Sequence, residues 1–234
     1  MLLELLDSGV AAVSIAALSM SGASIYVSRV VLPAKMKRAY FKSITALAAA
    51  VETKDSGTVG HARRIAELTV AVARILGING RELERIEYAA LLRDIGKASI
   101  PQAVLAKTTP LTEEEWKMVQ SHTLLGADMV ASVPFLSDTA DYVRHHHECW
   151  DGSGYPDKLK GEEIPFGSRI LAVTSDYDAM TSQRPYHAEP MDPYRALEEI
   201  RASAGIKYDP AVVEAFLDVF GEGFVLVSEL ARVA

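Results

Sequence analysis

Helical periodicity is the feature of this sequence that most constrains its fold. From Met36 to about Leu76 apolar residues recur at helical spacing, with one break at 54-KDSGTVG-60, which predicts two amphipathic helices. No segment shows the apolar and polar alternation that is typical of a half-buried strand. The sequence therefore predicts an all-α fold, with further helices over residues 81–95, 112–132, 137–148, 168–182, 192–203 and 210–220.

Two helix starts are marked by capping residues. Thr112 is followed three positions later by Glu115, which is a capping box, and Asp192 precedes Pro193, which suits the first helical position. These signals predict helices that begin close to residues 112 and 192.

The amino-terminal segment contains an uncharged stretch over residues 8–28. At about 1.5 Å per residue, a helix of this length just crosses the hydrocarbon core of a bilayer. Acidic residues precede the stretch and basic residues follow it, so the positive-inside rule places the remainder of the chain in the cytoplasm. We therefore predict a single-pass anchor in the inner (cytoplasmic) membrane over residues 1–35, a domain over 36–222 and a tail over 223–234. The alternative is an apolar helix that packs on the domain or on a second copy of the chain.

The charge balance bears on the class of partner. The net charge is −7, from 24 basic and 31 acidic residues mixed throughout, which argues against a wide phosphate-backbone footprint and so against DNA or RNA. The only cysteine, Cys149, cannot form an intrachain disulfide, as expected in a reducing compartment. A small nucleotide in a local basic pocket remains compatible with this composition.

Histidines and one aspartate form the candidate metal-binding set. Dispersed His and Asp side chains on separate helices are how a helical bundle builds a metal site in its core. A lone histidine is more often a core residue, but three adjacent histidines directly before a glycine-rich loop, 145-HHHECWDGSGYP-156, favour a ligand role. The residues of the set are His61, Asp94, His122, His145, His146 and His147.

The motifs in this order resemble those of the HD-GYP family, HD-superfamily phosphohydrolases associated with cyclic di-GMP breakdown. The resemblance runs from about Ala46 to Phe220 and implies an HD-type helical bundle. It is carried by the segments 60-GHARRIAELT-69, 91-LLRDIGK-97, 121-SHTLLGA-127, 145-HHHECWDGSGYP-156 and 169-RILAVTSDYDAMTSQRPY-186.

The resemblance implies a site for two divalent metal ions, iron or manganese, bridged by Asp94. One ion would be held by His122, His146, His147 and Asp94, all of which are present. The other would use His61 and Asp94, together with a histidine and a helical aspartate that this chain lacks. Gly57 stands where some members add a glutamate for a third ion, so no third ion is expected.

Two substitutions fall on the same metal position. Arg93 replaces the histidine of the HD pair, and Ser175 replaces the helical aspartate. A guanidinium offers only N–H donors and stays protonated, so Arg93 cannot bind a metal ion. We expect Arg93 to pair with Asp94, the alternative being an Arg93 that extends into solvent. The neighbouring Asp176 should point away from the face that presents residue 175, because one helical residue turns the side chain by about 100°. At most one ion per chain is therefore expected.

The resemblance also implies the nucleotide contacts. Lys97 and Arg184 match family residues that contact the cyclic dinucleotide, His187 is a further basic position, and solvated surface charges are the alternative. Asp94 and Lys97 are the residues expected at the chemical step. The loop 154-GYP-156 (Gly154, Tyr155 and Pro156) would line the ligand site or contact a protein partner, and a homodimer is left open.

Three functions compete at this stage. We favour a module that binds cyclic di-GMP, or a protein, with weak or no hydrolysis. The alternatives are an active metal-dependent cyclic di-GMP phosphodiesterase and a phosphohydrolase acting on another nucleotide.

Overall fold

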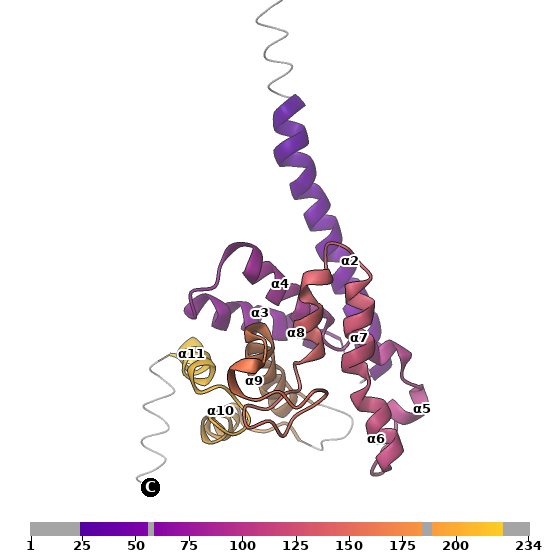
Figure 1. Ribbon diagram of the computed structural model, residues 1–234, viewed down its shortest axis with the longest axis vertical. Helices are drawn as coiled ribbons and strands as arrows, with labels where there is room; N and C mark the ends of the chain where they lie inside the picture. The colour runs from indigo at the N-terminus through magenta and orange to yellow at the C-terminus, as the bar shows by residue number, and fades with distance from the viewer. Residues whose placement is uncertain (1–23, 56–58, 184–188, 222–234) are drawn as a thin grey trace, which may run out of the picture. The chain divides into compact units, whose positions relative to one another are not determined.

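The computed structural model describes residues 24–55, 59–183 and 189–221 (Figure 1). The chain divides into two compact units, residues 1–43 and 44–234. Within the described residues the secondary structure is helical, and β pairing is limited to an isolated bridge between Ala204 and Tyr208. The predicted all-α fold is therefore confirmed.

Most of the helical elements follow one another with short connections, and a longer one, residues 145–160, joins α8 to η4. Four of them are brief π or 3-10 turns, here called η1 to η4, and the others are α-helices, which Figure 1 labels. In chain order they are η1 (Val27–Val31), α2 (Leu32–Asp55), α3 (His61–Ile75), α4 (Gly80–Leu92), η2 (Ile95–Ser99), α5 (Gln102–Leu105), α6 (Glu113–Gln120), α7 (His122–Ala131), η3 (Ser137–Thr139), α8 (Ala140–Arg144), η4 (Gly161–Glu163), α9 (Phe166–Thr181), α10 (Pro193–Ala202) and α11 (Pro210–Phe220).

The core of the second unit is built around α3 and α9. Helix α3 packs against α4, α9 and α11, while α9 also contacts α8 and α10 (Figure 1). Apolar side chains on the facing sides of these helices are fully buried, among them Ile65, Ile86, Val173 and Phe216. Burial of each such side chain contributes about 1.5–3 kcal/mol to the free energy of unfolding. The apolar residues that recur at helical spacing in the sequence therefore stabilise this bundle.

Both predicted capping signals are present. The Thr112 side chain accepts a hydrogen bond from the Glu115 amide, and the Glu115 carboxylate accepts one from the Thr112 amide. The Asp192 side chain caps α10. The predicted helix over residues 112–132 is instead two helices, α6 and α7, which meet at Ser121. The Ser121 hydroxyl donates to the Met118 carbonyl, a side-chain to backbone bond that commonly bends helices.

Gly96 allows η2 to lie directly against α7. A Cβ atom at this position would lie 2.0 Å from the carbonyl oxygen of His122 and 2.6 Å from the amide nitrogen of Gly126. Both atoms belong to backbone and cannot move aside easily. The glycine of the segment 94-DIGK-97 is therefore what lets Asp94 approach His122.

We expect Gly96→Ala to destabilise the protein by about 3 kcal/mol or more, because α7 would have to move away from η2. Urea unfolding followed by circular dichroism measures the change. Ala98→Ser, on an exposed position of the same turn, is the control and should leave the free energy of unfolding unchanged. A Gly96→Ala protein as stable as wild type would contradict the close packing of η2 on α7.

The predicted membrane anchor requires a correction. Across the residues that the structure describes, no helix combines the length and the apolar character that crossing a bilayer needs. Only residues 24–28 of the uncharged stretch are described, and they are followed by Arg29, Lys35, Lys37 and Arg38. Four basic side chains within ten residues are costly to place in the hydrocarbon core of a bilayer. The remaining part of the predicted span, residues 8–23, lies outside the described residues. The predicted single-pass inner-membrane localisation is therefore wrong, and the orientation inferred from it no longer holds.

Candidate metal centre

Three histidines converge at one end of α7. His122 is the first residue of α7, and His146 and His147 follow the end of α8 in a turn. One ligand nitrogen from each ring lies within 4.8 Å of the other two. Ligand atoms around a single ion lie roughly 3–4 Å apart when the bonds are about 2.1 Å long, so a small inward shift would bring these three nitrogens to the spacing of ligands on one ion.

Hydrogen bonds to the backbone fix the orientation of two of these rings. His122 Nδ1 donates to the Val119 carbonyl at 2.7 Å, and His146 Nδ1 donates to the Val143 carbonyl at 2.6 Å. The Nε2 atoms of both rings are buried, and neither has a hydrogen-bond partner among the residues that the structure describes. Buried polar atoms rarely stay unsatisfied, and a histidine whose Nδ1 is bonded in this way presents an Nε2 lone pair to a metal. The donor set therefore fits a divalent ion.

Burial keeps these imidazoles neutral. It lowers the pKa of His146 to about 3, and it also lowers the pKa values of His122 and His147 below the ordinary value. A neutral imidazole is the form that binds a metal, so no proton has to be displaced near neutral pH.

Asp94 lies beside the three histidines. It is the N-cap residue of η2, and its Oδ1 atom lies 3.7 Å from His122 Nε2. Burial alone would raise the pKa of Asp94, but the charges of Lys97 and Arg93 hold it well below its usual range. The carboxylate is therefore ionised and borders the cluster on the side of His122. Among the described residues, the atoms close enough to share an ion come from the three histidines, so a ligand role for Asp94 stays a prediction.

Arg93 pairs with Asp94 as expected. Its Nη2 atom lies 3.0 Å from Asp94 Oδ2, its Nη1 atom donates to the Ala90 carbonyl, and its side chain is only 6% exposed. The alternative of a solvent-extended arginine is wrong. The guanidinium thus contacts one carboxylate and one backbone carbonyl through two different nitrogens. These contacts stabilise the buried cation without a metal ion.

Ser175 faces the same space as Arg93. A cavity of about 110 Å³ is lined by Arg93, Asp94 and Ser175, together with Lys97, His146, His147, Asp176 and Ala179. The expectation that Asp176 would point away from this face is wrong in part, because Asp176 also lines the cavity. Its Oδ2 atom accepts a hydrogen bond from Tyr208 and pairs with Lys207, so two partners already hold that oxygen.

His61 is held by a different carboxylate. Its Nδ1 atom lies 2.7 Å from Asp178 Oδ2, and Arg64 contacts both residues. Among the described residues, the group of nitrogens close enough to share an ion does not include His61. A carboxylate on one ring nitrogen is nevertheless the arrangement that orients metal-binding histidines, and Asp178 was not among the predicted site residues.

The loop 154-GYP-156 packs directly on the cluster. The Tyr155 ring stacks on His147 with centroids 4.9 Å apart. A Cβ atom at Gly154 would lie 2.3 Å from the Cys149 amide nitrogen, so only glycine lets the loop approach this backbone. His145 turns away, and its two ring nitrogens contact the Asp141 carbonyl and Asp157. Pro156 follows Tyr155 through a cis peptide bond.

The end of α2 supplies two residues that the sequence analysis did not identify. Asp55 Oδ2 lies 2.8 Å from Lys97 Nζ, and Lys97 also pairs with Asp94 at 3.0 Å. Lys54 donates to the carbonyls of Ala98 and Ile100 at the end of η2. The two carboxylates raise the pKa of Lys97 although burial acts in the opposite direction, so Lys97 is a firmly charged cation at the edge of the histidine cluster.

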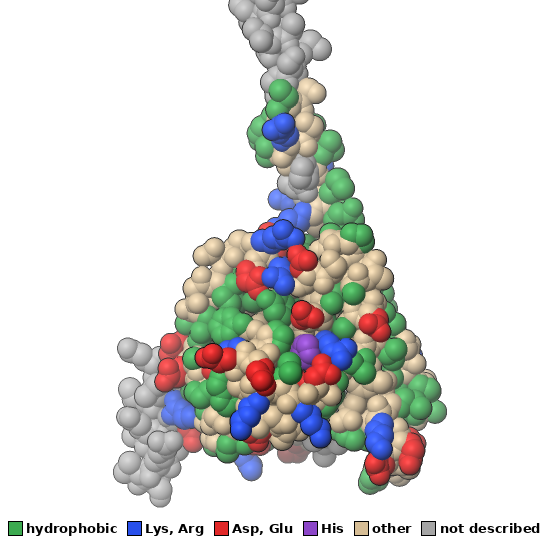
Figure 2. Space-filling view, viewed as in Figure 1, with side chains coloured by type: hydrophobic (Ala, Val, Ile, Leu, Met, Phe, Trp, Pro, Cys, Tyr) green, Lys and Arg blue, Asp and Glu red, His purple; other side chains and the backbone are tan. Residues whose placement is uncertain are grey.

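Two predicted nucleotide contacts are not placed by the structure. Arg184 and His187 lie outside the described residues. On the face shown in Figure 2, histidine reaches the surface over a small area that basic and acidic side chains border. Side chains of both charge signs therefore lie around the exposed histidine on this face.

An all-helical bundle with inward histidines beside an aspartate is the architecture of HD-type phosphohydrolases. The HD domain family matches residues 45–212, and the chain belongs to that family. HD-domain phosphohydrolases depend on metal ions, and the histidine cluster is a compatible site.

Curated relatives place the chain with proteins of the HD-GYP type. The cyclic di-GMP phosphodiesterase of Thermotoga maritima is 40% identical over 169 residues, which are 71% of this chain and 45% of that protein. The cyclic di-GMP phosphodiesterase response regulator RpfG of Xanthomonas campestris is 40% identical over 179 residues, 75% of this chain and 47% of that one. A 3′3′-cGAMP-specific phosphodiesterase of Vibrio cholerae is 32% identical over 186 residues, 79% and 35% of the two chains. The chain thus spans less than half the length of these relatives.

Solved structures support the fold. A crystal structure of a cyclic GMP-AMP specific phosphodiesterase from V. cholerae superposes with a TM-score of 0.60 at 22% identity, over 79% of this chain and 49% of that one. An HDG"Y"P protein from Bdellovibrio bacteriovorus gives a TM-score of 0.56 at 18% identity, over 68% and 51%. The predicted HD-GYP resemblance is confirmed.

Proposed function

We propose that this protein is a cyclic di-GMP binding module of the HD-GYP type that holds one divalent ion and hydrolyses its ligand weakly or not at all. The observation that carries the proposal is the buried Arg93 guanidinium, which lies 3.0 Å from Asp94 in place of a ligand histidine. The ligand class is supported by the relatives named as cyclic di-GMP phosphodiesterases.

The proposed ion would be iron or manganese, held by His122, His146, His147 and Asp94. Imidazole and carboxylate ligands suit either metal. When bound, such an ion polarises a phosphoryl oxygen as a Lewis acid. We propose no second ion, because Arg93 and Ser175 leave the second position short of two ligands.

The residues of the chain itself bind and orient the phosphodiester. Lys97 supplies a fixed positive charge at the edge of the cluster, where Asp94 and Asp55 hold its ammonium in place. Arg93 adds a second cation on the other oxygen of Asp94. Both can attract a phosphate by charge-assisted hydrogen bonds, but neither can take a proton from water near neutral pH, because both remain protonated.

The alternative function is an active phosphodiesterase. It is favoured by the cluster of three histidines with Asp94 beside His122 and by the activity in the names of the relatives. A protein partner on the 154-GYP-156 loop and a homodimer remain predictions, with no observation that adds to them.

The metal content of anaerobically purified protein, together with a hydrolysis assay, tests the proposal. We expect at most one ion per chain, binding of cyclic di-GMP, and little linear product in the presence of Mn²⁺ or Fe²⁺. Two ions per chain with efficient turnover would establish the alternative instead.

A further inference from the structure

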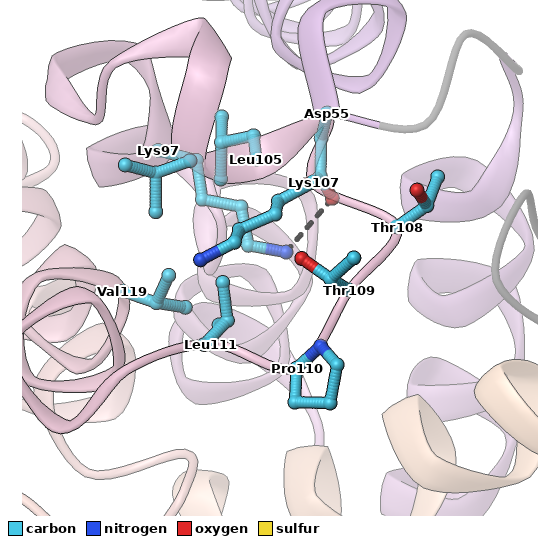
Figure 3. Close-up of a pocket in the computed structure, with 10 residues that line it drawn as sticks. Asp55, Lys97, Leu105, Lys107, Thr108, Thr109, Pro110, Leu111 and Val119 are labelled. Atoms are coloured by element: carbon cyan, nitrogen blue, oxygen red, sulfur yellow. Dashed lines mark hydrogen bonds and ion pairs between the residues drawn. The ribbon is translucent and has the colours of Figure 1, made fainter.

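A second and larger cavity adjoins the candidate metal centre. Its volume is about 430 Å³, within the range of about 300–1,000 Å³ that is typical of ligand pockets, and it lies among η2, α5, α6 and the loop between α5 and α6 (Figure 3). Lys97 lines this cavity and also the smaller cavity beside Arg93 and Ser175. One ligand could therefore contact Lys97 and reach into both spaces.

The walls of the larger cavity suit a flat ring. Val104, Leu105, Leu111 and Val119 contribute apolar surface from α5, the following loop and α6. Apolar walls that enclose a few polar groups are the usual construction of a small-molecule site. A nucleobase has two apolar faces and a polar edge, and it matches such a space.

The polar groups of the cavity determine which nucleobase edge can form hydrogen bonds there. Lys97 and Lys107 extend into it, and the Lys97 ammonium is joined to the Asp55 carboxylate (Figure 3). Lys107 also pairs with Glu115, but an ammonium has three donors. Lys97 already pairs with Asp55 and Asp94 and is left one donor for the phosphodiester. The remaining donors of Lys107 therefore suit the O6 and N7 acceptors of guanine, and the Asp55 carboxylate can accept from the guanine amino group. The amino group of adenine would face the lysine donors instead.

We propose that the cavity formed by α5, its following loop and α6 is a guanine subsite of the same binding site. It takes one base of a cyclic dinucleotide whose phosphodiester lies at Lys97 and the histidine cluster. The inference rests on the proposed function. It adds the part of the chain that would determine base specificity, because neither the histidine cluster nor Arg93 contacts the base.

Filling the cavity tests the inference in the full-length chain loaded with Mn²⁺. Thr109 is exposed on the loop and lines the cavity, so Thr109→Trp places a large ring there with little effect on the core. We expect the affinity for cyclic di-GMP to fall about tenfold or more, since the contacts of one bound base contribute about 1–3 kcal/mol. The affinities for Mn²⁺ and for inorganic phosphate should not change. Ala103→Trp, exposed on α5 and not part of the lining, is the matched control and should bind all three like wild type.

A second variant tests the base preference and decides the matter if Thr109→Trp does not fold. Wild type should bind cyclic di-GMP about tenfold more tightly than cyclic di-AMP, and Lys107→Met should remove most of that preference. If wild type binds cyclic di-GMP and both variants bind it equally well, the guanine subsite is wrong and the proposed function stands. If wild type binds Mn²⁺ but neither cyclic dinucleotide, the proposed function is wrong and the subsite with it.

Discussion

The double substitution Arg93→His with Ser175→Asp is expected to raise the metal content from one ion per chain to two and to increase hydrolysis of cyclic di-GMP by about a hundredfold or more. A missing ion removes several kcal/mol of transition-state stabilisation, and about 1.36 kcal/mol corresponds to tenfold in rate. Two-ion sites clamp both the attacking and the leaving oxygens, which a single ion cannot do.

The structure provides the space for this reversion. Arg93, Asp94 and Ser175 line one cavity, so a new imidazole and a new carboxylate would face each other across it. The family resemblance assigns the remaining nitrogen to His61, which Asp178 orients. Arg93 currently neutralises Asp94, and its removal frees that carboxylate oxygen for a metal.

Each single substitution should have little effect. Arg93→His leaves the site without the helical carboxylate, and Ser175→Asp leaves the guanidinium in place. Each single variant therefore still lacks one ligand, and the effects of ligands that act as a unit are strongly non-additive. Metal stoichiometry and turnover of the wild type, both single variants and the double variant are the measurements. A wild-type protein that already holds two ions and matches the turnover of the double variant would show that Arg93 is a tolerated substitution.

Much of the fold could be predicted from the sequence because helical spacing is a local signal. The capping box at Thr112 and the cap at Asp192 were found for the same reason, since each depends on residues within one turn. The break of the helix at Ser121 was not found, because the apolar spacing continues across it; the Ser121 hydroxyl donates to the Met118 carbonyl at this point. The predicted anchor over residues 8–28 was wrong. The basic residues after Ser28 were interpreted as the cytoplasmic flank of a span, but no helix among the described residues has the length and apolar character that crossing a bilayer needs.

The candidate site was predicted from motif order, but its supporting contacts were not. Asp55 and Asp178 contact Lys97 and His61 from positions 42 and 117 residues away, and no local pattern reveals such pairs. The segment 54-KDSGTVG-60 was interpreted only as a break between helices. The role of Gly96 likewise depends on the His122 backbone opposite it, which only the three-dimensional structure brings into contact.

Replacing His146 by leucine is expected to lower the affinity for Mn²⁺ by about a hundredfold or more, because loss of an orienting partner alone commonly costs about 10–100-fold and here a ligand itself is lost. The stability of the metal-free protein should change by no more than about 1 kcal/mol. His146 is fully buried and its Nε2 atom has no hydrogen-bond partner, so an apolar side chain of similar size removes an unsatisfied polar atom and loses one hydrogen bond, that of Nδ1 to Val143.

This pair of results separates a ligand from an ordinary core histidine. A histidine that served the core alone would leave Mn²⁺ binding unchanged when replaced, whatever happened to stability. His145→Leu is the matched control, since His145 is the preceding residue but contacts the Asp141 carbonyl and Asp157 instead of the cluster. Calorimetric titration with Mn²⁺ and urea unfolding of the metal-free proteins measure both quantities. Equal loss of Mn²⁺ affinity in the His145 and His146 variants would mean that the loop, and not the Nε2 atom of His146, determines metal binding, and the three-histidine site would have to be abandoned.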